Sequence, residues 1–121
     1  MSDSFRVLYY QLTLGPAHMA RIRALDAQPG IECLGVALAE KERTRNYQLT
    51  EEDRANVVTV MPGTYEDEPL VRRIRAARSH LRSDRPDAII VDSPADPVQW
   101  MLGSTARGQG TAALTLSLIH I

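Results

Sequence analysis

The feature of this sequence that most constrains its fold is a regular alternation between short apolar runs and segments with helical spacing. Continuous apolar runs are typical of strands buried on both faces, and apolar residues that recur every three or four positions are typical of helices. The runs predict strands at residues 5–10, 31–38, 56–61, 86–92 and 111–116. Helices are predicted around residues 19–25, 70–81 and 98–105. This order is typical of right-handed βαβ units, so the sequence predicts an α/β fold: a Rossmann-like parallel sheet of about five strands with flanking helices.

The predicted helix over residues 70–81 has the clearest pattern. Its apolar stripe runs at positions i, i+4, i+7 and i+11 through Leu70, Ile74, Ala77 and Leu81. Arginines occupy the remaining faces, and we expect them to form a solvated surface. A membrane-facing basic patch is the alternative, which acidic residues at both ends of the helix weaken by offsetting the positive charge.

Composition restricts the classes of partner and the cellular setting. The 121 residues are 44% hydrophobic and 24% charged, as in an ordinary globular domain, and the formal net charge of -1 provides no field that would attract nucleic acid. No run approaches the ~20 apolar residues that a membrane span needs, and the first residues do not resemble an export signal. Cys33 is the only cysteine, so we expect no internal disulfide, no cysteine-based metal site and a reducing, cytoplasmic setting.

The last residues suggest that a longer protein is represented here. A chain that ends in the apolar run 117–121, directly after a predicted strand, leaves that strand as an exposed apolar edge. We therefore expect one domain over residues 1–116, a non-native or truncated tail over 117–121, and a parent protein that continues.

Several common α/β functions lack their motifs. The sequence contains neither G-x-G-x-x-G nor G-x-x-x-x-G-K-[ST], which disfavours a dinucleotide dehydrogenase and a P-loop nucleotidase. The predicted first and third strands end without the acidic residues of a receiver domain. These classes are therefore not expected.

The loops that follow the strands are the expected place for chemistry, because ligands of open parallel sheets bind at the carboxyl ends of the strands. The loops to examine run from Gly15 to His18, from Gly63 to Glu66 and from Asp92 to Asp96. His18 can form hydrogen bonds or move a proton near neutral pH. Asp92 can act as a general base on a hydroxyl, or it can cap the turn that follows it.

Three segments carry a resemblance to a known family. A glycine-containing loop enters an arginine-rich helix in GPAHMARIRAL, a strand reads I-E-x-x-x-V-x-L from residue 31, and RPDAIIVDSPADP surrounds residues 85–97. Together they resemble the N-terminal domain of a GT-B glycosyltransferase of the family 4-like group, over residues 5–116. The resemblance implies two Rossmann-like domains that face each other across a cleft. The first receives the sugar acceptor, the second, missing here, holds a nucleotide-sugar donor, and no other cofactor is needed.

The resemblance also implies roles for single residues. Gly15 matches the small residue that lets backbone approach the donor phosphate or sugar, although it can equally make a simple turn. His18 would meet donor or acceptor, unless it is an ordinary surface histidine. Asp92 stands where many members of the family carry a histidine near the reacting sugar, and we expect it and His18 to be catalytic, with Ser93 beside them binding substrate. Tyr47, in the polar stretch 40–55, would line the acceptor side or anchor its loop.

Three functions therefore stay open. The first is the acceptor-binding part of a glycosyltransferase, inactive by itself, with no metal. The second is a small flavodoxin-like binding or regulatory domain. The third is part of a sugar-nucleotide epimerase with the same two-domain fold.

Overall fold

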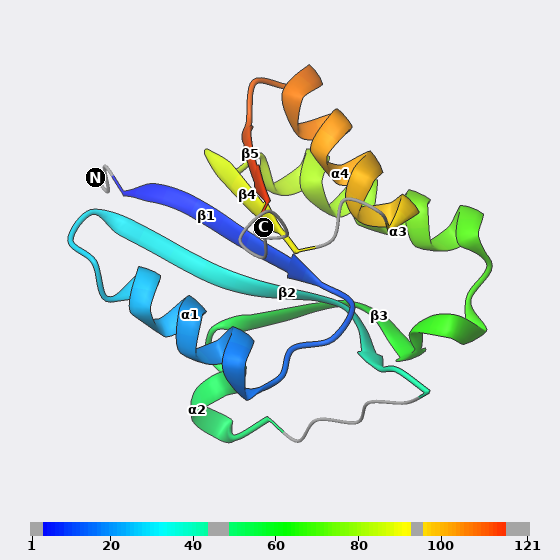
Figure 1. The fold of residues 1–121 in the computed structure, drawn as a ribbon, viewed down its shortest axis with the longest axis horizontal. Coiled ribbons are helices and arrows are strands. Elements are labelled where there is room, and N and C mark those ends of the chain that lie inside the picture. The colour runs from blue at the N-terminus through cyan, green and yellow to red at the C-terminus, as the bar shows by residue number, and fades with distance from the viewer. Residues whose placement is uncertain (1–3, 44–48, 93–95, 116–121) are drawn as a thin grey trace, which may run out of the picture.

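The computed structural model describes residues 4–43, 49–92 and 96–115, and it confirms the predicted α/β class (Figure 1). The strands are β1 (Phe5–Gln11), β2 (Ile31–Lys41), β3 (Val57–Thr64), β4 (Ala88–Val91) and β5 (Ala112–Thr115). The helices are α1 (Pro16–Asp26), α2 (Glu51–Arg54), α3 (Leu70–Asp84) and α4 (Pro97–Gly108), with a 3-10 turn η1 at Tyr65–Asp67. All strands are parallel, in the order β3-β2-β1-β4-β5.

This strand order fixes where the chain reverses direction across the sheet. From β1 the chain moves outward to β2 and β3, then crosses back past β1 to β4 and β5. Because both halves use right-handed crossovers, α1 covers one face while α3 and α4 cover the other. The order is that of a Rossmann fold, whereas flavodoxin-like sheets have the order 2-1-3-4-5, so a flavodoxin-like arrangement is not the one observed.

The core lies on both faces of the central strand β1. Leu8 and Tyr10 point into the layer beneath α3 and α4, while Val7 and Tyr9 point toward α1. Alternation of side chains along a strand produces this division, and it explains why β1 reads as a continuous apolar run. Cys33 of β2 is buried on the α1 side, where burial raises the pKa of its thiol to about 11. The thiol therefore stays protonated at neutral pH.

Several element boundaries differ from the predicted ones. The third strand was expected to end at residue 61, but β3 continues through Pro62 and Gly63 to Thr64. This is possible because β3 is an edge strand, where a missing backbone N–H is tolerated, and because Gly63 adopts a φ of 84°. The polar stretch after β2 holds the single-turn helix α2, which Thr50 caps by accepting a hydrogen bond from the Asp53 backbone N–H.

The helices follow their predicted signals more closely. In α4, which begins within a residue of the predicted position, Asp96 is the N-cap, since its Oδ2 accepts the Gln99 backbone N–H at 3.0 Å. In α3, Ala77 and Leu81 are fully buried, whereas Leu70 at its first turn is 43% exposed. The predicted apolar stripe is therefore buried along the second half of α3 and open at its beginning. The predicted tail 117–121 lies outside the described residues.

Candidate functional site

The candidate site lies where the order of the strands reverses, between the adjacent carboxyl ends of β1 and β4. Asp92 directly follows β4, and His18 lies in the first turn of α1, which follows β1. Asp92 Oδ2 and His18 Nε2 are 3.6 Å apart, and the two side chains are 26% and 15% exposed. A ligand that reaches this edge of the sheet would therefore meet a carboxylate and an imidazole together.

The start of α1 holds the His18 ring in a defined orientation. Gly15 is the N-cap residue, Pro16 occupies the first helical position, and His18 Nδ1 accepts the Gly15 backbone N–H at 3.0 Å. In a neutral imidazole the nitrogen that accepts cannot also carry the proton, so this hydrogen bond assigns the proton to Nε2. The Nε2–H group is the one that faces Asp92.

The loop that leads into α1 is fixed to the neighbouring strand. Thr13 is buried and donates its hydroxyl hydrogen to Glu42, just beyond the end of β2. The Leu12 carbonyl accepts the Ala39 backbone N–H at 3.1 Å. These contacts position the N-terminus of α1, and with it His18, relative to the sheet.

Asp92 is held from two further directions. Its Oδ1 accepts the hydroxyl of Tyr9 at 3.2 Å, and its backbone N–H donates to Gln99 Oε1 of α4 at 2.9 Å. Arg21, one turn along α1 from His18, donates to the Tyr9 hydroxyl oxygen at 3.1 Å. Burial raises the pKa of Tyr9, with the Arg21 hydrogen bond acting in the opposite direction. The net increase keeps the hydroxyl protonated at neutral pH, so that it donates to Asp92.

The arrangement suits proton transfer to and from a bound hydroxyl group. The 3.6 Å separation of Oδ2 and Nε2 exceeds the range of a normal hydrogen bond. A hydroxyl oxygen bound beside the pair, within about 3 Å of both atoms, would donate to the Asp92 carboxylate and accept from His18 Nε2–H. A positioned carboxylate within hydrogen-bond reach of a hydroxyl is the geometry of a general base. Among the described residues, no group of three or more His, Cys, Asp or Glu side chains is arranged to hold a metal ion.

The structure brings together three of the five residues singled out in the sequence. Gly15, His18 and Asp92 form one contact network, whereas Tyr47 and Ser93 lie outside the described residues. Gly15 has an extended backbone with φ near -102°, which any residue can adopt, and its N–H is already bonded to His18. The approach of a donor phosphate to this amide would therefore have to displace the imidazole.

Sequence reasoning missed three members of the network: Tyr9, Arg21 and Gln99. Tyr9 was counted as part of a buried strand, and the pattern of a strand does not show which tyrosine hydroxyl reaches the sheet edge. Arg21 had a usable signal, because it follows His18 by three positions and so lies on the same side of α1. Gln99 is only 2% exposed on α4, and a buried polar side chain next to a strand end is itself a marker of such a network.

Comparison with known proteins adds no family assignment: the sequence matches no protein-family model and none of the curated proteins. Across the described ranges, no helix combines the length and apolar character that crossing a bilayer requires.

Proposed function

We propose that this chain forms the acceptor-side domain of a nucleotide-sugar-dependent glycosyltransferase of the GT-B type. The observation that carries the proposal is the pairing of Asp92 Oδ2 with His18 Nε2 at 3.6 Å, at the switch point of a Rossmann sheet. The switch point is where such sheets bind their ligands, and the pair is suited to receive a hydroxyl group. The resemblance of GPAHMARIRAL and RPDAIIVDSPADP to the family 4-like group supports the same assignment.

In this proposal Asp92 removes the proton from the acceptor hydroxyl as that oxygen attacks the anomeric carbon of the donor sugar. The bond between that carbon and the nucleoside diphosphate breaks, and the diphosphate leaves with the bonding electron pair. His18 Nε2–H orients the acceptor oxygen, and Tyr9 orients the Asp92 carboxylate. The general base supplies one part of the rate enhancement, typically about 10²- to 10⁴-fold.

The donor is assigned to a second Rossmann-like domain, so the 121-residue chain alone is expected not to transfer sugar. The test compares this chain with a protein that also contains the donor domain of its reading frame. Both are incubated with UDP-, GDP- and ADP-sugars and a panel of hydroxyl acceptors, and mass spectrometry measures the glycosylated product. We expect product only from the longer protein. Transfer by the short chain, or a reading frame that encodes no second α/β domain, would contradict the proposal, and interconversion of nucleotide sugars without an acceptor would identify an epimerase.

A further inference from the structure

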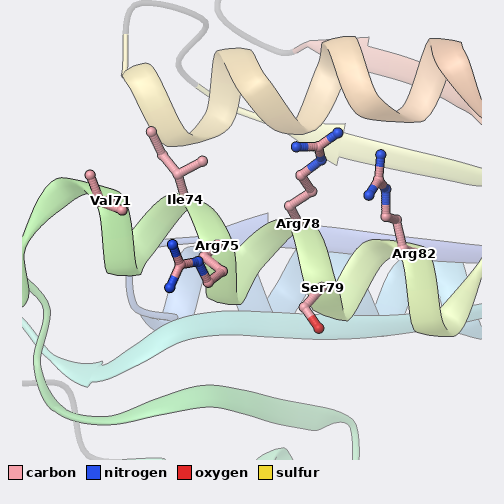
Figure 2. Close-up of a pocket in the computed structure, with 6 residues that line it drawn as sticks. All are labelled: Val71, Ile74, Arg75, Arg78, Ser79 and Arg82. Carbon is pink, nitrogen blue, oxygen red and sulfur yellow. The ribbon is translucent and has the colours of Figure 1, made fainter.

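The outer surface of α3 and α4 contains a groove that the proposed function does not use. Along α3 it encloses about 450 Å³ and is lined by Val71, Ile74, Arg75, Arg78, Ser79 and Arg82 (Figure 2). A second hollow of about 260 Å³ shares Arg78 and Arg82 and continues onto α4, at Ser104, Thr105, Gly108 and Gln109. We call the two hollows together the α3–α4 groove.

The arginines of the groove differ from the other arginines of α3. Arg72 forms an ion pair with Glu68 at 3.1 Å, and Arg73 donates to the Glu68 carbonyl at 2.7 Å while lying over the Tyr65 ring. Within the part of the chain that the structure describes, Arg75, Arg78 and Arg82 make neither a hydrogen bond nor an ion pair. Their donor groups are therefore available to a ligand.

The free arginines carry an energetic cost that packing does not explain. Like charges three or four positions apart on a helix repel each other, and Arg75, Arg78 and Arg82 have this spacing. A cation in the last turn of a helix is stabilised by the helix dipole, which accounts for Arg82. It does not account for Arg75 and Arg78, which lie near the middle of α3. The repulsion between Arg78 and Arg82, whose side chains both extend toward α4 (Figure 2), falls if an anion binds between them.

The shape and chemistry of the groove indicate the kind of anion. Figure 2 shows the side chains of Ile74, Arg78 and Arg82 extending toward α4. Two guanidinium groups and the exposed Ser104 hydroxyl provide donors on both sides, the arrangement with which proteins bind phosphate. At the other end, Ile74 and the 65% exposed Val71 offer apolar surface. We infer that the α3–α4 groove binds a ligand that carries a phosphate group joined to an apolar group.

This site is separate from the one at Asp92. The helices α3 and α4 cover the face of the sheet opposite α1, and Arg82 and Gly108 lie at the ends of their helices. In βαβ units these ends precede the next strand, so the phosphate end of the groove lies toward the edge of the sheet opposite Asp92. The inference therefore does not depend on the proposed glycosyl transfer.

The test is an NMR titration of the 121-residue protein with hexyl phosphate, with hexyl glucoside as the uncharged probe of matched chain length. We expect saturable shifts of the backbone amides of Ser104, Thr105 and Gly108 with hexyl phosphate, and none of these shifts with hexyl glucoside. The double variant R78Q/R82Q should weaken binding by roughly tenfold or more, since hydrogen bonds to charged groups are the strong ones. These side chains are exposed, so the fold should be kept, which circular dichroism checks.

The matched control is R72Q, because Arg72 lies on the same helix and carries the same charge but faces Glu68. Binding to R72Q should stay within about twofold of the wild type, because Arg72 does not line the groove and shares no partner with Arg78 or Arg82. If R72Q and R78Q/R82Q lost the same amount of affinity for hexyl phosphate, the binding would depend only on the overall positive charge of the helix. That result would contradict a specific site in the groove. Binding to phosphatidylglycerol vesicles, but not to phosphatidylcholine vesicles or to hexyl phosphate, would assign the surface to a membrane and overturn it as well.

Discussion

Two neighbouring tyrosines of β1 carry polar contacts to opposite faces of the sheet. Tyr9 donates to Asp92 on the α1 side. On the opposite face, the Tyr10 hydroxyl lies 2.8 Å from Nδ1 of His80, a residue of α3. Burial raises the pKa of Tyr10, so its hydroxyl stays protonated, and it donates to His80 Nδ1 when the imidazole carries its proton on Nε2. This requires His80 to be neutral. The same strand thus holds one network that is open to ligand and one that is part of the core.

The His80 contact predicts a dependence of stability on pH. Burial lowers the pKa of His80 in the folded state, with Arg6 acting in the same direction and Asp84 opposing it. The unfolded chain therefore binds a proton at His80 more readily than the folded chain does. The contribution of His80 to the free energy of unfolding is fully present above the unfolded pKa of about 6.5, and it decreases as the pH falls below that value. Urea unfolding between about pH 8 and about pH 5 measures this loss.

His80→Gln is the matched variant, since its side chain can still accept from Tyr10 but does not titrate. Its free energy of unfolding should change less across this interval than that of the wild type. A curve as steep as the wild-type curve would show that His80 is not the responsible group. Asp84, whose pKa the hydrogen bond from Arg6 lowers, acts in a different range, because its stabilisation is lost only in more acidic solution.

At the level of elements, the packing of α1 on β2 depends on Gly35. A Cβ atom at this position would come within 2.7 Å of Ile22 Cδ1 and of Leu14 Cδ1, so these two buried side chains would have to shift within a packed layer. We expect Gly35→Ala to lower the free energy of unfolding by about 1–3 kcal/mol, the usual cost of overpacking a core. Urea denaturation monitored by circular dichroism measures the change.

Gly103→Ala is the control for that substitution. Gly103 lies in the interior of α4, and nothing stands within 4 Å of the position its Cβ would take. Alanine favours a helix interior over glycine, so this variant should gain roughly 0.5–1 kcal/mol. If both alanines changed stability in the same direction, the contacts at Gly35 would not be the cause.

The elements also show which parts of the fold could be predicted. Buried strands such as β1 and β4 could be recognised in the sequence because each is apolar on both faces and so forms a continuous apolar run. The predicted end of β3 was wrong because Pro62 interrupts a central strand but is tolerated in an edge strand. Whether a strand lies at an edge depends on the tertiary structure, which the sequence pattern does not show. The helix α2 was missed because four residues are too few to establish a period.

For the whole molecule, the topology determines which loops meet. Because the strands are parallel, Gly15, His18 and Asp92 all lie at the carboxyl-terminal edge of the sheet. The alternation of strands and helices in the sequence was enough to predict this. That Asp92 lies beside His18 follows from the adjacency of β1 and β4, which is a consequence of the crossover. The contribution of Tyr9 needed the structure, because it depends on the direction of one buried side chain and on the hydrogen bond to it from Arg21.

The turnover of Asp92→Asn shows whether Asp92 is the general base of the proposed glycosyl transfer. The asparagine keeps the shape of the side chain but cannot accept the acceptor's proton. Glu32→Gln is the control, since it removes a carboxylate from the first residues of β2, at the opposite edge of the sheet.

The measurement is kcat for sugar transfer by the protein that includes the donor domain. We predict that Asp92→Asn lowers kcat by about a hundredfold or more, the usual contribution of a general base, while Glu32→Gln stays near the wild type. Wild-type turnover by Asp92→Asn would show that Asp92 is not the general base.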